Sequence, residues 1–130
     1  MSRHKRVINT FAARVRKCAL SLPQTYEDAP WGFPVFKVAD NKLFAWMIAD
    51  ENALHVTMKL TPDERELARM LPYVRKASHL GRYGWITAAV TDDESLESAL
   101  EWICESYWLR APVELRKAVE TVENVDDEPR

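Results

Sequence analysis

The amino-acid sequence predicts an α+β domain of two layers, in which helices pack on one face of an antiparallel sheet. Three observations lead to this prediction. Apolar residues recur with helical spacing at both ends of the chain, short apolar runs typical of strands lie between them, and the connections between these runs are short. Short connections favour antiparallel hairpins. The predicted order is α-βββ-α-β-α, with an additional short helix at the end.

The first helix is predicted to begin at Ser2, its capping residue, and to end near Leu20. Its apolar side chains recur every three or four residues and form one stripe, which consists of Val7, Ile8, Phe11, Val15, Cys18, Ala19 and Leu22. Pro23 ends the helix. Residues 23–34 are rich in proline and are therefore predicted to form a loop.

Three strands are predicted at residues 35–38, 42–49 and 53–59, separated by turn-forming Asp and Asn residues. Thr61, Pro62 and Glu64 then predict the start of a helix, because they supply a cap, a first-turn proline and a capping-box partner. This helix is predicted to end near Met70. Residues 72–84 are predicted to form a loop, and residues 85–90 a fourth strand.

A long final helix is predicted from the caps Thr91, Asp92 and Asp93 to about Arg110. Its buried stripe is predicted to consist of Leu96, Ala99, Leu100, Ile103, Cys104 and Tyr107. Pro112 interrupts it, and residues 113–120 are predicted to form a short helix. The sequence thus predicts one domain over residues 1–120, followed by an acidic, flexible tail over residues 121–130.

Composition excludes several classes of protein. The chain of 130 residues has a net charge of −2 and only three glycines, which argues against a glycine-rich phosphate loop. No apolar run approaches the length of a membrane helix, and no signal peptide is predicted, so we expect a cytoplasmic, bacterial-type protein without a membrane partner. Cys18 and Cys104 are expected to be reduced and buried, and no Cys/His cluster predicts zinc.

No catalytic, cofactor or metal site is predicted. Nucleophilic catalysis needs a Ser or Cys beside a His, and the histidines are His4 in the N-terminal tail, His55 on the outward side of a strand and His79 in a loop. Glu27 and Asp28 are interpreted as a solvated pair. Among the acids Asp92, Asp93, Glu94, Glu97 and Glu101, those three or four residues apart share a helix face. The group is interpreted as favouring the helix dipole and solubility rather than binding iron.

Several motifs resemble the MmcQ/YjbR-like family and occur in its order over residues 20–110. They are Pro30-Trp31-Gly32, Val35-Phe36-Lys37-Val38, Lys42-Leu43-Phe44-Ala45, Thr57-Met58-Lys59, Leu80-Gly81-Arg82-Tyr83-Gly84-Trp85-Ile86 and Glu105-Ser106-Tyr107. Asn41 departs from the family's usual glycine. The resemblance implies an α+β fold similar to that of CyaY and of secretion chaperones. It also implies the family's usual description, a predicted DNA-binding protein.

Bases and aromatic residues concentrate in parts of the chain that are poor in acids. The basic-aromatic set consists of Lys37, Lys42, Lys59, Arg75, Lys76, His79, Arg82 and Trp85, with Tyr83 beside it. Such cations and rings suit a phosphate backbone or an unstacked base. The sequence therefore predicts a non-enzymatic DNA-binding domain, a monomer or homodimer. Two alternatives stay open: a peptide-binding adaptor, and a small-ligand module with a pocket near Trp31 and Trp46.

Overall fold

The computed structural model describes residues 3–117. The elements follow one another as α1 (Arg3–Leu20), β1 (Thr25–Asp28), β2 (Val35–Val38), β3 (Lys42–Ala49), β4 (Leu54–Lys59), α2 (Pro62–Ala68), β5 (Val74–Lys76), the 3₁₀ helix η1 (Gly81–Tyr83), β6 (Trp85–Val90) and α3 (Asp93–Arg110). Residues 113–117 form a further helical turn. The remainder of the predicted last helix, the acidic tail and the Ser2 cap lie outside the described residues.

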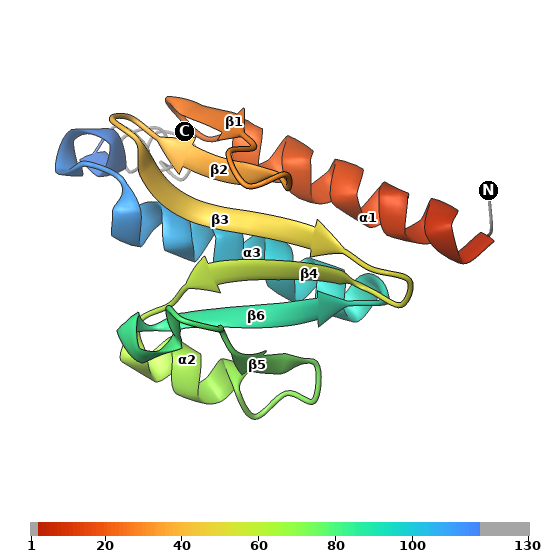
Figure 1. The fold of residues 1–130 in the computed structure, drawn as a ribbon. Helices are drawn as coiled ribbons and strands as arrows, with labels where there is room; N and C mark the ends of the chain where they lie inside the picture. Colours follow the sequence, from red (N-terminus) through yellow and green to blue (C-terminus); the bar gives the residue numbers. More distant parts are fainter. Residues whose placement is uncertain (1–2, 118–130) are drawn as a thin grey trace, which may run out of the picture.

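The strands form one antiparallel sheet in the order β1-β2-β3-β4-β6-β5. Helices α1 and α3 pack against one face of this sheet, and Figure 1 is seen from the opposite side, with α3 behind β3 and β4. We call the side toward the viewer the open face. The predicted α+β class and its two layers are confirmed.

The hydrophobic core lies between the sheet and the two long helices. Alternation along each central strand sends one set of side chains inward, such as Val56 and Met58 of β4 and Ile86 and Ala88 of β6. α1 contributes Ile8, Phe11, Val15 and Ala19, as its apolar stripe predicts. The other side chains of the same strands point to the open face, so strand register decides which residues are available there.

Two strands lie where the sequence predicted loops. β1 is part of the predicted 23–34 loop, and β5 is part of the predicted 72–84 loop. Both are edge strands of four and three residues, and most of their residues are exposed, so neither carries a run of alternating buried residues. Each owes its conformation to pairing, β1 with β2 and β5 with β6.

Several residues of the two apolar stripes are less buried than the prediction implies, Leu22 and Leu100 among them. Val7 is 41% exposed, Cys104 is exposed and Cys18 is only half-buried. Cys104 is exposed because α3 also buries Trp102 and Ser106. The centre of the buried face of α3 therefore points away from Cys104. A hydrogen bond with Cys104, together with burial, raises the pKa of the Cys18 thiol.

Both helices that begin after a strand carry the predicted type of cap. The Thr61 hydroxyl accepts the Glu64 N–H at 3.4 Å, and the Asp92 carboxylate accepts the Ser95 N–H at 2.8 Å. Ser95 Oγ in turn accepts the Asp92 N–H, which completes a capping box. Asp92, rather than Thr91 or Asp93, is therefore the capping residue of α3. No helix within residues 3–117 is long and apolar enough to cross a membrane.

Candidate functional site

Antiparallel pairing brings most of the basic-aromatic set to one end of the sheet. β2, β4 and β5 end there, and β3 and β6 begin there (Figure 1). Lys59 and Lys76 are the last residues of their strands, and Lys37 is the last but one of its strand. Lys42 and Trp85 are the first residues of theirs. Residues that are far apart in the sequence therefore become neighbours along one sheet end.

Strand register then divides these residues between the two faces. Lys37 pairs with Leu43, Lys59 with Trp85, and Arg75 with Thr87, all in positions that point to the open face. Lys42 pairs with the core residue Val38, and Lys76 pairs with the core residue Ile86. Lys42 and Lys76 thus belong to the helix-covered side and are exposed only at the end and edge of the sheet.

The remaining members of the set lie at and just before η1. Arg82 is exposed, and its guanidinium carbon lies 4.9 Å from the centre of the Tyr83 ring. His79 takes a left-handed backbone conformation with φ of 64°, in the loop that precedes η1. Both residues lie beside the sheet end where β6 begins.

Trp85 does not lie where a DNA-contacting ring would have to lie. It is only 5% exposed, and its ring stacks on Trp46 with centroids 5.3 Å apart. The Arg110 guanidinium lies 5.9 Å from the Trp85 ring, and its Nε donates to the Leu43 carbonyl at 2.8 Å. Because Trp85 is buried against Trp46 and Arg110, it offers no free ring face to a ligand.

The open face contains a groove of about 490 Å³, which we call the aromatic groove. Its lining comes from β3, β4, β5 and β6 and from two loops that flank the sheet; it consists of Trp31, Phe33, Leu43, Trp46, Ile48, His55, Thr57, Arg75, Ser78, His79, Leu80 and Thr87. Gly32, at φ +89°, makes the turn between Trp31 and Phe33. No carboxylate lines this groove.

Two hydroxyls lie among the aromatic residues of the groove. Thr57 of β4 and Thr87 of β6 are cross-strand partners, and their Oγ1 atoms are 2.8 Å apart. One hydroxyl must donate to the other, which leaves one proton and several lone pairs for a ligand. Besides His55, Arg75, Ser78 and His79, the groove thus has a largely buried hydroxyl pair that can both donate and accept.

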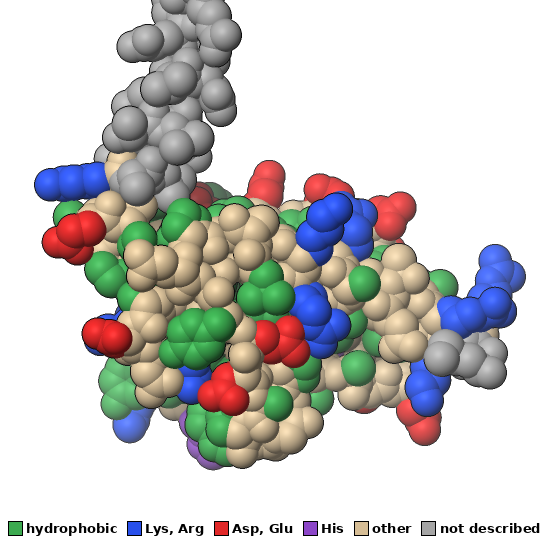
Figure 2. Space-filling model, turned by 90° about the horizontal axis from the view of Figure 1, so that it is seen from above, with side chains coloured by type: hydrophobic (Ala, Val, Ile, Leu, Met, Phe, Trp, Pro, Cys, Tyr) green, Lys and Arg blue, Asp and Glu red, His purple; other side chains and the backbone are tan. Residues whose placement is uncertain are grey.

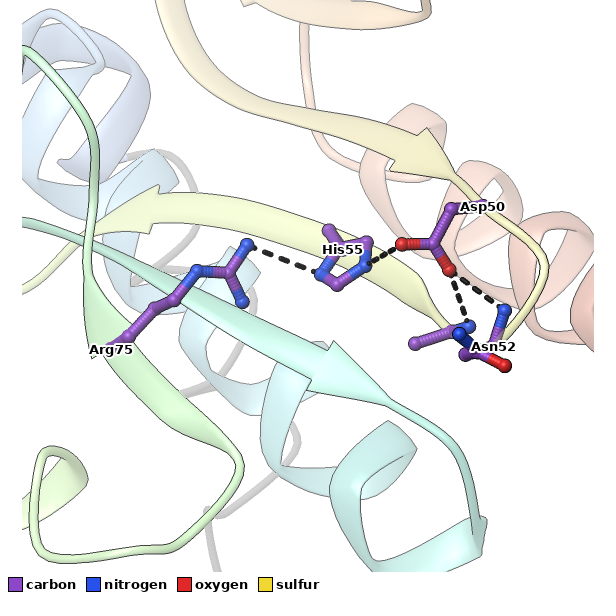
Figure 3. A network of polar contacts seen from close by, with 5 residues as sticks. Asp50, Asn52, His55 and Arg75 are labelled. Carbon is purple, nitrogen blue, oxygen red and sulfur yellow. Dashed lines mark hydrogen bonds and ion pairs between the residues drawn. The ribbon is translucent and has the colours of Figure 1, made fainter.

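A polar network lies at the end of the groove where β4 begins (Figure 3). His55 Nε2 lies 2.6 Å from an Asp50 carboxylate oxygen, and an Arg75 guanidinium nitrogen lies 3.2 Å from His55 Nδ1. A guanidinium can only donate, so His55 Nδ1 accepts and its Nε2–H donates to Asp50. These two hydrogen bonds therefore fix the His55 tautomer and hold Arg75 against the groove.

We predict that Asp50 makes stability depend on pH below pH 4. N–H groups of Asn52 and Ala53, together with His55, lower its pKa from 3.8 to about 2; the Asn52 bond is the largest cause. A lowered pKa means that folding favours the charged form, so this stabilisation is present above pH 3.8 and is lost as the pH falls toward 2.

The measurement is urea unfolding of the wild type and of Asp50→Asn at several pH values across that window. The wild type should lose more stability than the variant as the pH falls, because the amide does not titrate. NMR titration of the Asp50 carboxyl should give its midpoint directly. Parallel stability curves, or a midpoint near 3.8, would contradict the prediction.

Both acids of β1 form ion pairs, Asp28 on the open face and Glu27 on the helix-covered side. Lys37 Nζ lies 3.2 Å from the Asp28 carboxylate, and Arg16 Nε lies 2.7 Å from that of Glu27. The Ala29 N–H and Lys37 lower the pKa of Asp28, so Asp28 is held as an anion. Glu27 and Asp28, interpreted from the sequence as a solvated pair, thus lie in β1, and each has a cationic partner.

The surface beside β1 does not carry a charge of one sign. Figure 2 looks onto the molecule from this side, and acidic and basic side chains are interspersed there, apart from basic side chains that gather where α1 begins. Arg3, Lys5 and Arg6 are exposed at that end. Among residues 3–117, no group of three acids, histidines or cysteines is placed to hold a metal ion.

The sequence missed part of this site. His55, Thr57 and Thr87 were strand residues without a predicted role, and Phe33 was part of a loop. Trp31 and Trp46 were predicted as possible pocket residues, and both line the groove. The signal that could have identified the others is strand alternation, because it places His55 and Thr57 on the same side as Lys59.

Two solved structures share the fold of this chain, and a family model gives its family. A Deinococcus radiodurans protein described as a DUF419 domain aligns with a TM-score of 0.66 and 24% identity, over 75% of this chain and 76% of its own. A Pseudomonas syringae protein aligns with a TM-score of 0.54 and 20% identity, over 85% of this chain and 99% of its own. No curated protein matches. The YjbR family model matches residues 20–109, and the chain therefore belongs to the YjbR family.

Proposed function

We propose that this chain is a non-enzymatic domain that binds DNA across its open face. The observation that supports this best is the convergence of Lys37, Lys59 and Arg75 on that face, beside a groove whose lining holds rings and cations but no carboxylate. Arg82 lies at the same sheet end. Cations placed in this way attract phosphates, and such contacts are sensitive to salt but carry little sequence information.

The histidine network supports a role without catalysis. A general base needs a free nitrogen that faces a nucleophile. In His55 one ring nitrogen faces Asp50 and the other faces Arg75, so neither is available to activate a hydroxyl or thiol. The network instead positions a cation.

The short edge strands weigh against the peptide-binding adaptor. Strand addition needs a long free edge, whereas the edges here are β1, with four residues, and β5, with three. The small-ligand alternative has better support, since a groove of about 490 Å³ suits a compact planar molecule. An anionic aromatic compound would match its rings and Arg75.

The test is a fluorescence-anisotropy titration of labelled DNA at several salt concentrations. Two triple variants remove the same number of charges: Lys59→Ala/Arg75→Ala/Arg82→Ala on the open face, and Arg3→Ala/Lys5→Ala/Arg6→Ala at the start of α1. We expect the first to reduce the slope of log affinity against log salt by about 2 to 3, and the second to leave it unchanged. Binding that is absent, insensitive to salt or lost only in the α1 variant would overturn the proposal.

A further inference from the structure

The exposure of Trp31 is unusual for so large an apolar side chain. It is 64% exposed, although it lies beside Phe33, with ring centroids 6.0 Å apart, and lines the aromatic groove. Tryptophan is seldom left this exposed, because burying its ring is favourable. A ring that remains in water at the mouth of a groove is available to stack on a planar ligand.

The opposite side of the groove offers polar partners. Ser78, His79 and Leu80 line it from the loop before η1, and the left-handed conformation of His79 is a costly one for a residue with a side chain. Arg75 lies next to this loop, fixed by its contact with His55. The paired hydroxyls of Thr57 and Thr87 lie between the two sides.

We propose that the aromatic groove holds one unpaired base of single-stranded DNA, an inference that rests on the proposed function. Trp31 and Phe33 stack on the base, and the Thr57–Thr87 pair meets its polar edge with both a donor and acceptors. The phosphates on either side lie toward Arg75, which lines the groove, and Lys59, which follows the lining residue Thr57 by two positions on β4.

This arrangement selects single strands over duplex DNA. In a duplex each base is stacked on its neighbours and its pairing edge is occupied, so a ring and a hydroxyl pair cannot reach it without the cost of extrusion. A phosphate backbone, by contrast, is equally available in both forms. The groove therefore adds affinity only where a base is already unpaired.

The experiment compares three ligands of equal length: a single strand, the duplex of the same sequence, and an abasic strand that keeps the sugar-phosphate backbone. The proteins are the wild type, Trp31→Ala, Phe33→Ala and the control Met70→Ala, which removes another exposed apolar side chain away from the groove. Trp31 is exposed, so its replacement leaves the core intact. A free nucleoside monophosphate serves as a fourth ligand.

We expect the wild type to bind the single strand about tenfold more tightly than the duplex or the abasic strand. Trp31→Ala and Phe33→Ala should remove most of this preference and leave abasic binding unchanged, whereas Met70→Ala should change nothing. Equal, salt-sensitive affinity for all three polymers would overturn the base site but leave the proposed function standing. Absence of binding to every polymer would overturn both. A preference for single strands that survives both groove variants would place the base elsewhere, and a mononucleotide that binds as tightly as the strand would favour the small-ligand alternative.

Discussion

Replacement of Tyr107 by alanine should lower the free energy of unfolding by about 3 to 5 kcal/mol, the range found when large buried rings are truncated. The Tyr107 ring is 1% exposed and meets the Phe44 ring edge to face, with centroids 5.6 Å apart. Its hydroxyl donates to the Pro23 carbonyl at 3.0 Å and so ties α3 to the segment after α1. The variant loses a large packing contact and a hydrogen bond, and it leaves a cavity between sheet and helix.

Urea unfolding at neutral pH measures this loss, with Tyr107→Phe as the matched control. The control keeps the ring and removes only the hydroxyl, so it should cost about 1 kcal/mol. A domain of this size has a total stability of about 5 to 15 kcal/mol, and Tyr107→Ala should therefore be the least stable variant described here. A cost for Tyr107→Ala no larger than that of Tyr107→Phe would show that the ring does not hold the two layers together.

Replacement of Ser106 by alanine should cost about 2 to 4 kcal/mol, a large effect for the loss of one oxygen atom. Ser106 is fully buried on α3. Its Oγ donates to the Phe44 carbonyl at 2.6 Å and accepts the Lys59 N–H at 2.9 Å. Phe44 lies where the register between β2 and β3 shifts, so the hydroxyl satisfies a carbonyl at an irregular position of the ladder. Alanine would leave both backbone groups without this partner.

Ser98→Ala is the matched control on the same helix. Its hydroxyl lies 2.9 Å from the Tyr73 hydroxyl in a partly buried position, where water can replace the lost partner, so its removal should cost about 1 kcal/mol or less. Urea unfolding of both variants gives the difference. Equal costs would mean that water reaches the Ser106 position. Because Lys59 also reaches the open face, the Ser106 variant should weaken DNA binding together with stability.

The elements that the sequence predicted well are those whose own residues specify them. The bounds of β2, β3 and β6 match the prediction, and α3 ends at the predicted Arg110, since each carries its own apolar pattern and end signals. β1 and β5 lack such a pattern, and only their partners make them strands. The exposed Cys104 is a related case, because helical spacing shows that a face is buried but not where its centre lies.

The candidate site divides in the same way. The sequence by itself determined the α+β class, the family motifs and the residue types available for a ligand: bases and tryptophans away from the acidic segments. Only the tertiary structure decided that Lys37, Lys59 and Arg75 share a face, that Lys42 and Lys76 do not, and that Trp85 is buried against Trp46. The physical reason is that composition and periodicity are local properties of a chain. Which side chains meet across a sheet depends instead on register and on the loops that fold over its open face, and these are set by contacts between residues distant in sequence.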